Sequence, residues 1–117
     1  MRFGELSVWT EEADSGPIIR AEGEVDLGSV DALRRAASDA VKRKPERITF
    51  DLRRVTYIDS TGLGVLVATR RQLGNRSGSV VVITEQPAVL QSLMLTGLDR
   101  VIQVVPEPQY AASQPHN

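Results

Sequence analysis

The residues best suited to chemistry stand together in the segment YIDSTGLGVLV, residues 57–67. A carboxylate, Asp59, is followed by two hydroxyl side chains, Ser60 and Thr61, and then by two glycines. Apolar residues lie on both sides, which is typical of a strand that leads into a helix. Two chemistries fit this junction. One is a helix cap that accepts hydrogen bonds from unpaired backbone N–H groups, and the other is phosphorylation of a hydroxyl.

The two chemistries are compatible at Ser60. The N-terminus of a helix presents unpaired N–H groups and a partial positive charge, so it stabilises an added phosphate. A phosphoryl group would add about 1.5 to 2 negative charges to a serine that could also cap the helix.

Gly62 and Gly64 need a separate explanation, because a glycine inside a helix costs about 1 kcal/mol relative to alanine. Two of them in the first turn indicate a close approach, either by a partner or ligand or by the chain's own sheet. The spacing does not match a phosphate-binding P-loop, since no Lys-Ser/Thr pair follows the glycines.

The composition disfavours most enzyme chemistry. The chain has no cysteine, and its single histidine, His116, is next to last. We therefore expect no metal, no cofactor and no Ser-His-Asp catalysis. A small hydrolase that uses Ser60 and Asp59 would lack a base to activate the serine, and the GxSxG elbow is absent.

The charge and the hydropathy of the chain limit the classes of partner that we expect. The 14 basic and 15 acidic residues are interspersed and give a net charge of −1, so neither nucleic acid nor an anionic membrane surface is an expected partner. No apolar run approaches the roughly 20 residues of a membrane span, and the N-terminus lacks the apolar segment of a signal peptide. We expect a cytoplasmic protein.

The 117 residues indicate one domain, which we expect over residues 1–105, followed by a disordered tail at 106–117. Patterning predicts an alternation of strands and helices. The expected strands are 5–12, 17–25, 46–58, 80–85 and 100–105; the expected helices are 30–44, 60–73 and 87–96. The first two strands should form an antiparallel hairpin, Ser29 should cap the first helix, and 75–79 should form a turn. Arg53 and Arg54 are expected to face solvent.

Strand–helix–strand connections join parallel strands, so the strands that end near Val25, Ile58 and Thr84 should run parallel. Their carboxyl ends would then share one edge of the sheet, the usual place for a site. That edge is predicted to gather Asp26, Asp59, Ser60 and Glu85. Asp26 could orient the Ser60 hydroxyl or meet a cation of a partner, or it could be only a loop carboxylate or helix cap.

Three segments together resemble a known family: GEVD at 23–26, YIDSTGLGVLV at 57–67 and LTGLDRVI at 95–102. They resemble the STAS domain and, more narrowly, the bacterial anti-sigma factor antagonists. The resemblance extends from Leu6 to Val105. It implies an α/β fold with a mixed sheet of four to five strands, helices packed mainly on one side, and no catalysis by this chain.

The resemblance also implies a switch. The partner would be an anti-sigma factor that is also a serine kinase, with an ATP-binding fold of the histidine-kinase type, and it would phosphorylate Ser60. The unphosphorylated chain would hold that partner and so release the sigma factor, and a PP2C-type phosphatase would restore it. By the same match Asp59 precedes the acceptor, Thr61 follows it, and Asp26, Gly62 and Gly64 lie at the partner-facing surface.

Other interpretations stay open at this point. A STAS domain can serve as a scaffold without a phosphorylation switch, as a stressosome component or a subunit of a lipid-transport complex. It can also sense a small ligand or nucleotide, which an apolar pocket at the strand-end edge would support. The edge strands also allow weak pairing of two copies.

Overall fold

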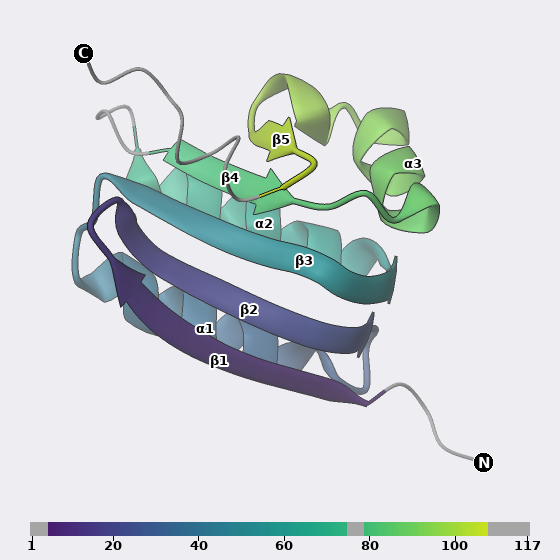
Figure 1. Ribbon diagram of the computed structural model, residues 1–117, viewed down its shortest axis with the longest axis horizontal. Helices are drawn as coiled ribbons and strands as arrows, with labels where there is room; N and C mark the ends of the chain where they lie inside the picture. Colours follow the sequence, from purple (N-terminus) through teal and green to yellow (C-terminus); the bar gives the residue numbers. More distant parts are fainter. Residues whose placement is uncertain (1–4, 75–78, 108–117) are drawn as a thin grey trace.

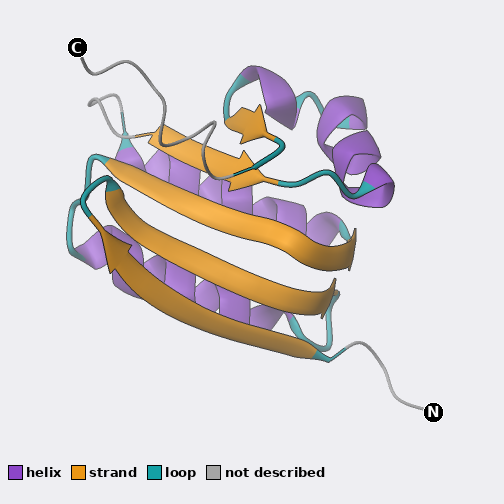
Figure 2. Cartoon of the chain, in the orientation of Figure 1, coloured by secondary structure: helices purple, strands orange, loops and turns teal. Residues whose placement is uncertain are grey.

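The computed structural model describes residues 5–74 and 79–107. These form a five-stranded sheet in the order β1-β2-β3-β4-β5, with helices α1 and α2 side by side on one face (Figure 1). The other face of β1, β2 and β3 carries no helix from the described residues (Figure 2). The elements are β1 Leu6–Ala13, β2 Gly16–Val25, α1 Val30–Lys42, β3 Arg47–Ile58, α2 Ser60–Leu73, β4 Ser79–Ile83, α3 Pro87–Leu95, the 3-10 helix η1 Leu98–Arg100 and β5 Gln103–Val105.

The predicted mixed α/β sheet and its strand directions are confirmed. β1 pairs with β2 in an antiparallel hairpin, and every later neighbouring pair is parallel. The turn expected at 75–79 lies outside the described residues except for Ser79. The same holds for the expected tail beyond Glu107, including His116.

Gly23, the first residue of the GEVD segment, has a structural reason to be glycine. Its φ is +126°, and a Cβ there would lie 1.9 Å from the backbone oxygen of Glu5. Glu5, the residue before β1, lies beside β2 at this point, and the N–H of Glu24 donates a hydrogen bond of 3.1 Å to the same oxygen. The glycine therefore allows the two backbones to approach each other.

The central strand β3 is irregular in a way that sets the end of the sheet. Relative to β2 it contains an extra residue at two places, once between Asp51 and Arg54 and once between Val55 and Tyr57. Such bulges re-aim side chains and increase the twist of a strand. The buried positions of β3 accordingly change from a continuous run over residues 48–52 to every third residue, at Leu52, Val55 and Ile58.

β4 is much shorter than β3, and one prediction fails for this reason. Ile83 at the end of β4 pairs with Asp51, so residues 52–58 of β3 extend beyond it. Glu85 therefore follows β4 at the level of Arg53, and the neighbouring Gln86 side chain donates to the Arg53 carbonyl at 3.1 Å. The prediction that Glu85 lies at the same edge as Asp59 and Ser60 is wrong.

The core lies between the sheet and the two helices. α1 contributes Leu33, Ala37 and Ala40, α2 contributes Leu66 and Leu73, and β3 contributes Ile48, Phe50 and Leu52. The β-branched run Val80–Val82 of β4, with Ile83, is buried on both faces, as its composition predicts. α3 contacts β3 and lies beyond the end of β4, in the space that a longer β4 would have occupied (Figure 1).

Candidate functional site

The candidate site is the junction between β3 and α2, where Asp59 is the residue that caps the helix. Its Oδ1 accepts hydrogen bonds from the backbone N–H of Thr61 at 2.9 Å and of Gly62 at 3.2 Å. Its own N–H donates to the carbonyl of Val25 at 3.0 Å, which ties the junction to the end of β2. A cap of this kind stabilises a helix by about 1 kcal/mol.

The two hydroxyl side chains of the junction have different surroundings. The Thr61 hydroxyl donates to Oδ1 of Asp59, and its side chain is half-buried. Ser60 is the first residue of α2, is exposed, and forms no side-chain hydrogen bond with the described part of the chain. Of the two neighbours, Ser60 is thus the one whose hydroxyl is available to another molecule.

The Asp59 carboxylate also connects the junction to the loop between β2 and α1. Burial raises its pKa, but hydrogen bonds from the Thr61 hydroxyl and from the backbone N–H groups of Gly62, Thr61 and Leu27 more than offset this, and the pKa lies below its ordinary value. The donor from Leu27 belongs to the β2–α1 loop. Asp59 therefore joins the start of α2, through its carboxylate, to the end of β2, through its N–H.

Asp26 braces that loop. Its Oδ1 accepts the N–H of Gly28 at 3.0 Å, and its carbonyl accepts the N–H groups of Ser29 and Val30. No hydrogen bond joins Asp26 to Ser60 among the described residues, although the pairing of Val25 with Ile58 puts the two loops side by side. The Asp26 carboxylate therefore stabilises its own loop, and the residue lies at the edge of the sheet where the sequence placed it.

The predicted capping role of the Ser29 side chain is wrong. Ser29 occupies the N-cap position of α1 without a side-chain cap. Its hydroxyl instead donates to the carbonyl of Glu24 at 2.7 Å and accepts the N–H of Asp26 at 3.0 Å. The hydroxyl is used to close the loop, and this use competes with capping.

Each of the two glycines matches one of the explanations offered for the pair. A Cβ on Gly62 would lie 2.6 Å from side-chain carbons of both Ile58 and Val25, so α2 can sit on β2 and β3 only with glycine here. Gly64 is exposed, and nothing lies within 4 Å of the position that its Cβ would take. Packing of the helix on its own sheet therefore explains Gly62, while Gly64 opens onto the surface.

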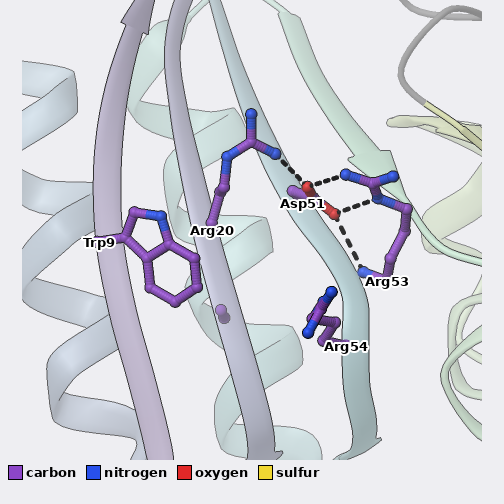
Figure 3. Close-up of a pocket in the computed structure, with 6 residues that line it drawn as sticks. Trp9, Arg20, Asp51, Arg53 and Arg54 are labelled. Atoms are coloured by element: carbon purple, nitrogen blue, oxygen red, sulfur yellow. Dashed lines mark hydrogen bonds and ion pairs between the residues drawn. The ribbon is translucent and has the colours of Figure 1, made fainter.

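A second cluster of charged groups lies on the helix-free face of the sheet, in a hollow of about 170 Å³ (Figure 3). The buried Asp51 forms ion pairs there with Arg20 and Arg53. Arg53 binds it with two nitrogens, at 2.9 and 2.7 Å. The hollow is lined by Trp9, Arg20, Ala21, Asp51, Arg53 and Arg54.

The ion-pair cluster was missed by the sequence analysis, which assigned Arg53 only to solvent. The available signal was Asp51 itself, an acidic residue within the apolar strand segment ITFDL. Burial raises the pKa of Asp51, yet the hydrogen bonds and charges of Arg53 and Arg20 bring it below the ordinary value. The cluster lies eight residues before Asp59 along the chain and is separate from the Ser60 junction.

Within residues 5–74 and 79–107, no cluster of carboxylates and histidines has the makings of a metal site. No helix in these ranges is long and apolar enough to cross a membrane.

Comparison with known proteins places this geometry in a family. The STAS domain model matches residues 8–111, and the chain belongs to the STAS domain family. An anti-sigma F factor antagonist of Paenibacillus polymyxa is 28% identical over 88 residues, which cover 74% of this chain and 75% of that protein.

Solved structures agree with the family assignment. The crystal structure of an anti-sigma factor antagonist from Mycobacterium paratuberculosis is 30% identical, covers 92% of both chains and superposes with a TM-score of 0.86. The Bacillus cell fate determinant SpoIIAA in its phosphorylated form shares the fold, with a TM-score of 0.71, 21% identity and coverage of 92% of this chain and 98% of that one. The chain thus resembles several proteins that are named anti-sigma factor antagonists.

Proposed function

We propose that this chain is an anti-sigma factor antagonist, a binding protein rather than an enzyme. We propose further that it binds an anti-sigma factor and that phosphorylation of Ser60 releases that partner. The observation that carries the proposal is the exposed Ser60 at the first position of α2, next to a Thr61 whose hydroxyl is held by Asp59. The family and the names of the relatives support the antagonist role.

The local chemistry explains why Ser60 rather than Thr61 would be the acceptor. Phosphoryl transfer requires a hydroxyl oxygen that can reach the donor phosphate in line, with its proton free to leave. The Thr61 hydroxyl donates its proton in a hydrogen bond to Asp59, and the Thr61 side chain is half-buried. A kinase would have to break that hydrogen bond to use Thr61, whereas Ser60 is exposed.

A phosphate on Ser60 would stay on the surface as an unpaired charge. The Asp59 carboxylate already occupies the N–H groups of Thr61 and Gly62, the donors that would otherwise bind an anion at this helix start. Asp59 is itself negatively charged, so the phosphate would not displace it without a further cost in charge repulsion. The modified surface therefore presents more negative charge to the partner without a structural change in the fold.

The cost of burying that charge is the proposed switch. Desolvating a phosphate dianion in a protein interface costs several kcal/mol unless a cation pairs with it. A partner surface that fits a neutral serine need not supply a cation. A penalty of only about 2.7 kcal/mol would lower the affinity about a hundredfold.

The modification requires two partners, which we propose to be a serine kinase that is itself the anti-sigma factor and a PP2C-type phosphatase that restores the serine. Incubation of the chain with its cognate kinase and ATP, followed by tandem mass spectrometry, should place the phosphate on Ser60. Ser60→Ala should still bind the kinase and resist modification. Phosphate found only on Thr61 would overturn the assignment of the acceptor.

A further inference from the structure

Leu27, on the loop between β2 and α1, is a large apolar side chain that the fold holds out into solvent. It is 77% exposed, although only Asp26 separates it from Val25, the buried last residue of β2. Single exposed leucines are common and need no explanation by themselves. Leu27 differs because it lies two residues after Val25, whose carbonyl accepts the N–H of Asp59, the residue that caps the helix of Ser60.

The loop that carries Leu27 is fixed on both sides. Before it, the N–H of Asp26 donates to the Ser29 hydroxyl at 3.0 Å, and that hydroxyl donates to Glu24. After it, the N–H of Gly28 donates to the Asp26 carboxylate at 3.0 Å. A side chain presented from so constrained a backbone loses little conformational entropy when a partner covers it.

We infer that Leu27 is an apolar anchor for the same anti-sigma factor that docks at Ser60. The inference rests on the proposed function. The N–H of Asp59 donates to the carbonyl of Val25 at 3.0 Å, and the Asp59 carboxylate caps the helix that Ser60 begins, so the loop that carries Leu27 lies beside the Ser60 junction. A typical interface covers about 800 Å² on each partner, so a protein that covers Ser60 also covers Leu27.

The two residues would have different tasks. Burial of Leu27 in an apolar pocket of the partner supplies affinity, as buried apolar anchors at the centre of an interface do. Ser60 supplies control, because only its modification changes the charge of the patch. The partner surface should accordingly combine an apolar pocket with a neighbouring region that fits an uncharged hydroxyl.

Leu95 offers a matched control. It has the same side chain and is 79% exposed. Leu95 ends α3, which follows β4, whereas Leu27 lies in the loop that follows β2, so β3 lies between the two places (Figure 1). Leu27→Ala, Leu27→Met and Leu95→Ala all retain the backbone N–H groups. We therefore expect all three to melt within a few degrees of the wild type.

The test is calorimetric titration of each variant with a purified anti-sigma factor kinase that binds the wild type. Leu27→Ala should bind at least about tenfold more weakly, because several methyl and methylene groups leave the buried interface. Leu95→Ala should stay within about twofold of the wild type, and Leu27→Met should recover most of the affinity. In phosphorylation assays Leu27→Ala should raise KM by a similar factor and leave kcat unchanged.

The outcomes separate the inference from the proposed function. Wild-type affinity for Leu27→Ala, or an equal loss in Leu95→Ala, would overturn the anchor and leave the Ser60 switch intact. A wild-type chain that binds no anti-sigma factor and accepts no phosphate at Ser60 would overturn both.

Discussion

At the junction of β3 and α2, the Asp59 carboxylate fixes the positions of the neighbouring groups. It accepts hydrogen bonds from the backbone of Thr61 and Gly62 and from the Thr61 hydroxyl. The N–H of the same residue donates to the carbonyl of Val25 at the end of β2. These bonds start α2, occupy the hydroxyl beside Ser60 and join the junction to the neighbouring strand. A single carboxylate thus prepares the surface on which Ser60 is displayed.

The lowered pKa of Asp59 leads to a prediction about pH. A carboxyl group whose pKa is lower in the folded chain than in the unfolded chain stabilises the fold above its unfolded value, which is 3.8 for aspartate. That contribution is lost as the pH falls through the folded pKa. Asp59→Asn should therefore be less stable than the wild type at neutral pH, with a gap that narrows as the pH falls below 3.8 and through the lower pKa of the folded chain.

Urea unfolding at several pH values measures this gap. Asp31→Asn is a suitable control, because Asp31 lies on the exposed side of α1 and forms an ion pair with Arg34 there. Such a surface pair contributes about 0 to 1 kcal/mol. A gap for Asp59→Asn that stayed constant with pH, or that matched the control, would contradict the role of the ionised cap.

At the scale of the elements, the two glycines of α2 provide a paired prediction. Gly62→Ala would push a Cβ to within 2.6 Å of Ile58 and Val25, so the helix must move or the strands must repack. We expect a loss of about 1 to 3 kcal/mol in the free energy of unfolding. Gly64→Ala meets open space and should gain up to about 1 kcal/mol from helix propensity.

Denaturant unfolding of the two variants checks this contrast. Equal effects would show that the contact of α2 with β2 and β3 is looser than the structure has it. The affinity of Gly64→Ala for the anti-sigma factor adds a separate readout, since a weaker complex of a more stable chain would mean that the partner approaches the helix at Gly64.

Much of this level was predictable from the sequence, because period-two and period-3.6 patterns reflect burial directly. The order of strands and helices, the hairpin and the parallel strands followed from such patterns. The predictions fail where contacts between distant parts of the chain determine the local structure. The bulges of β3 and the early end of β4 depend on strand pairing, and they moved Glu85 away from the edge where Asp59 lies.

The same limit applies to individual residues of the site. Ser, Asp and Thr all favour helix starts, so the sequence could not tell which of Asp59 and Ser60 was the cap. Ser29 has the same preference, but its hydroxyl donates to the carbonyl of Glu24 in β2 and accepts the N–H of Asp26 in place of a helix N–H. The role of Asp51 required knowledge that Arg20 and Arg53 lie on the same face of the sheet.

At the scale of the whole molecule, the sheet separates two regions with different tasks. The helix-free face carries the paired charges around Asp51, which satisfy a buried carboxylate (Figure 3). The end of the sheet where β2 and β3 finish carries Leu27, Asp59 and Ser60 on short, hydrogen-bonded connections. A partner can therefore dock at that end, and a phosphate can be added there, without disturbing the core.

The most direct test of this account compares the affinity of one purified anti-sigma factor for two forms of the chain, unmodified and phosphorylated on Ser60, by calorimetry. We predict that the phosphorylated form binds about a hundredfold more weakly, because its phosphate must lose water without gaining a cation. Equal affinity of the two forms would contradict the account.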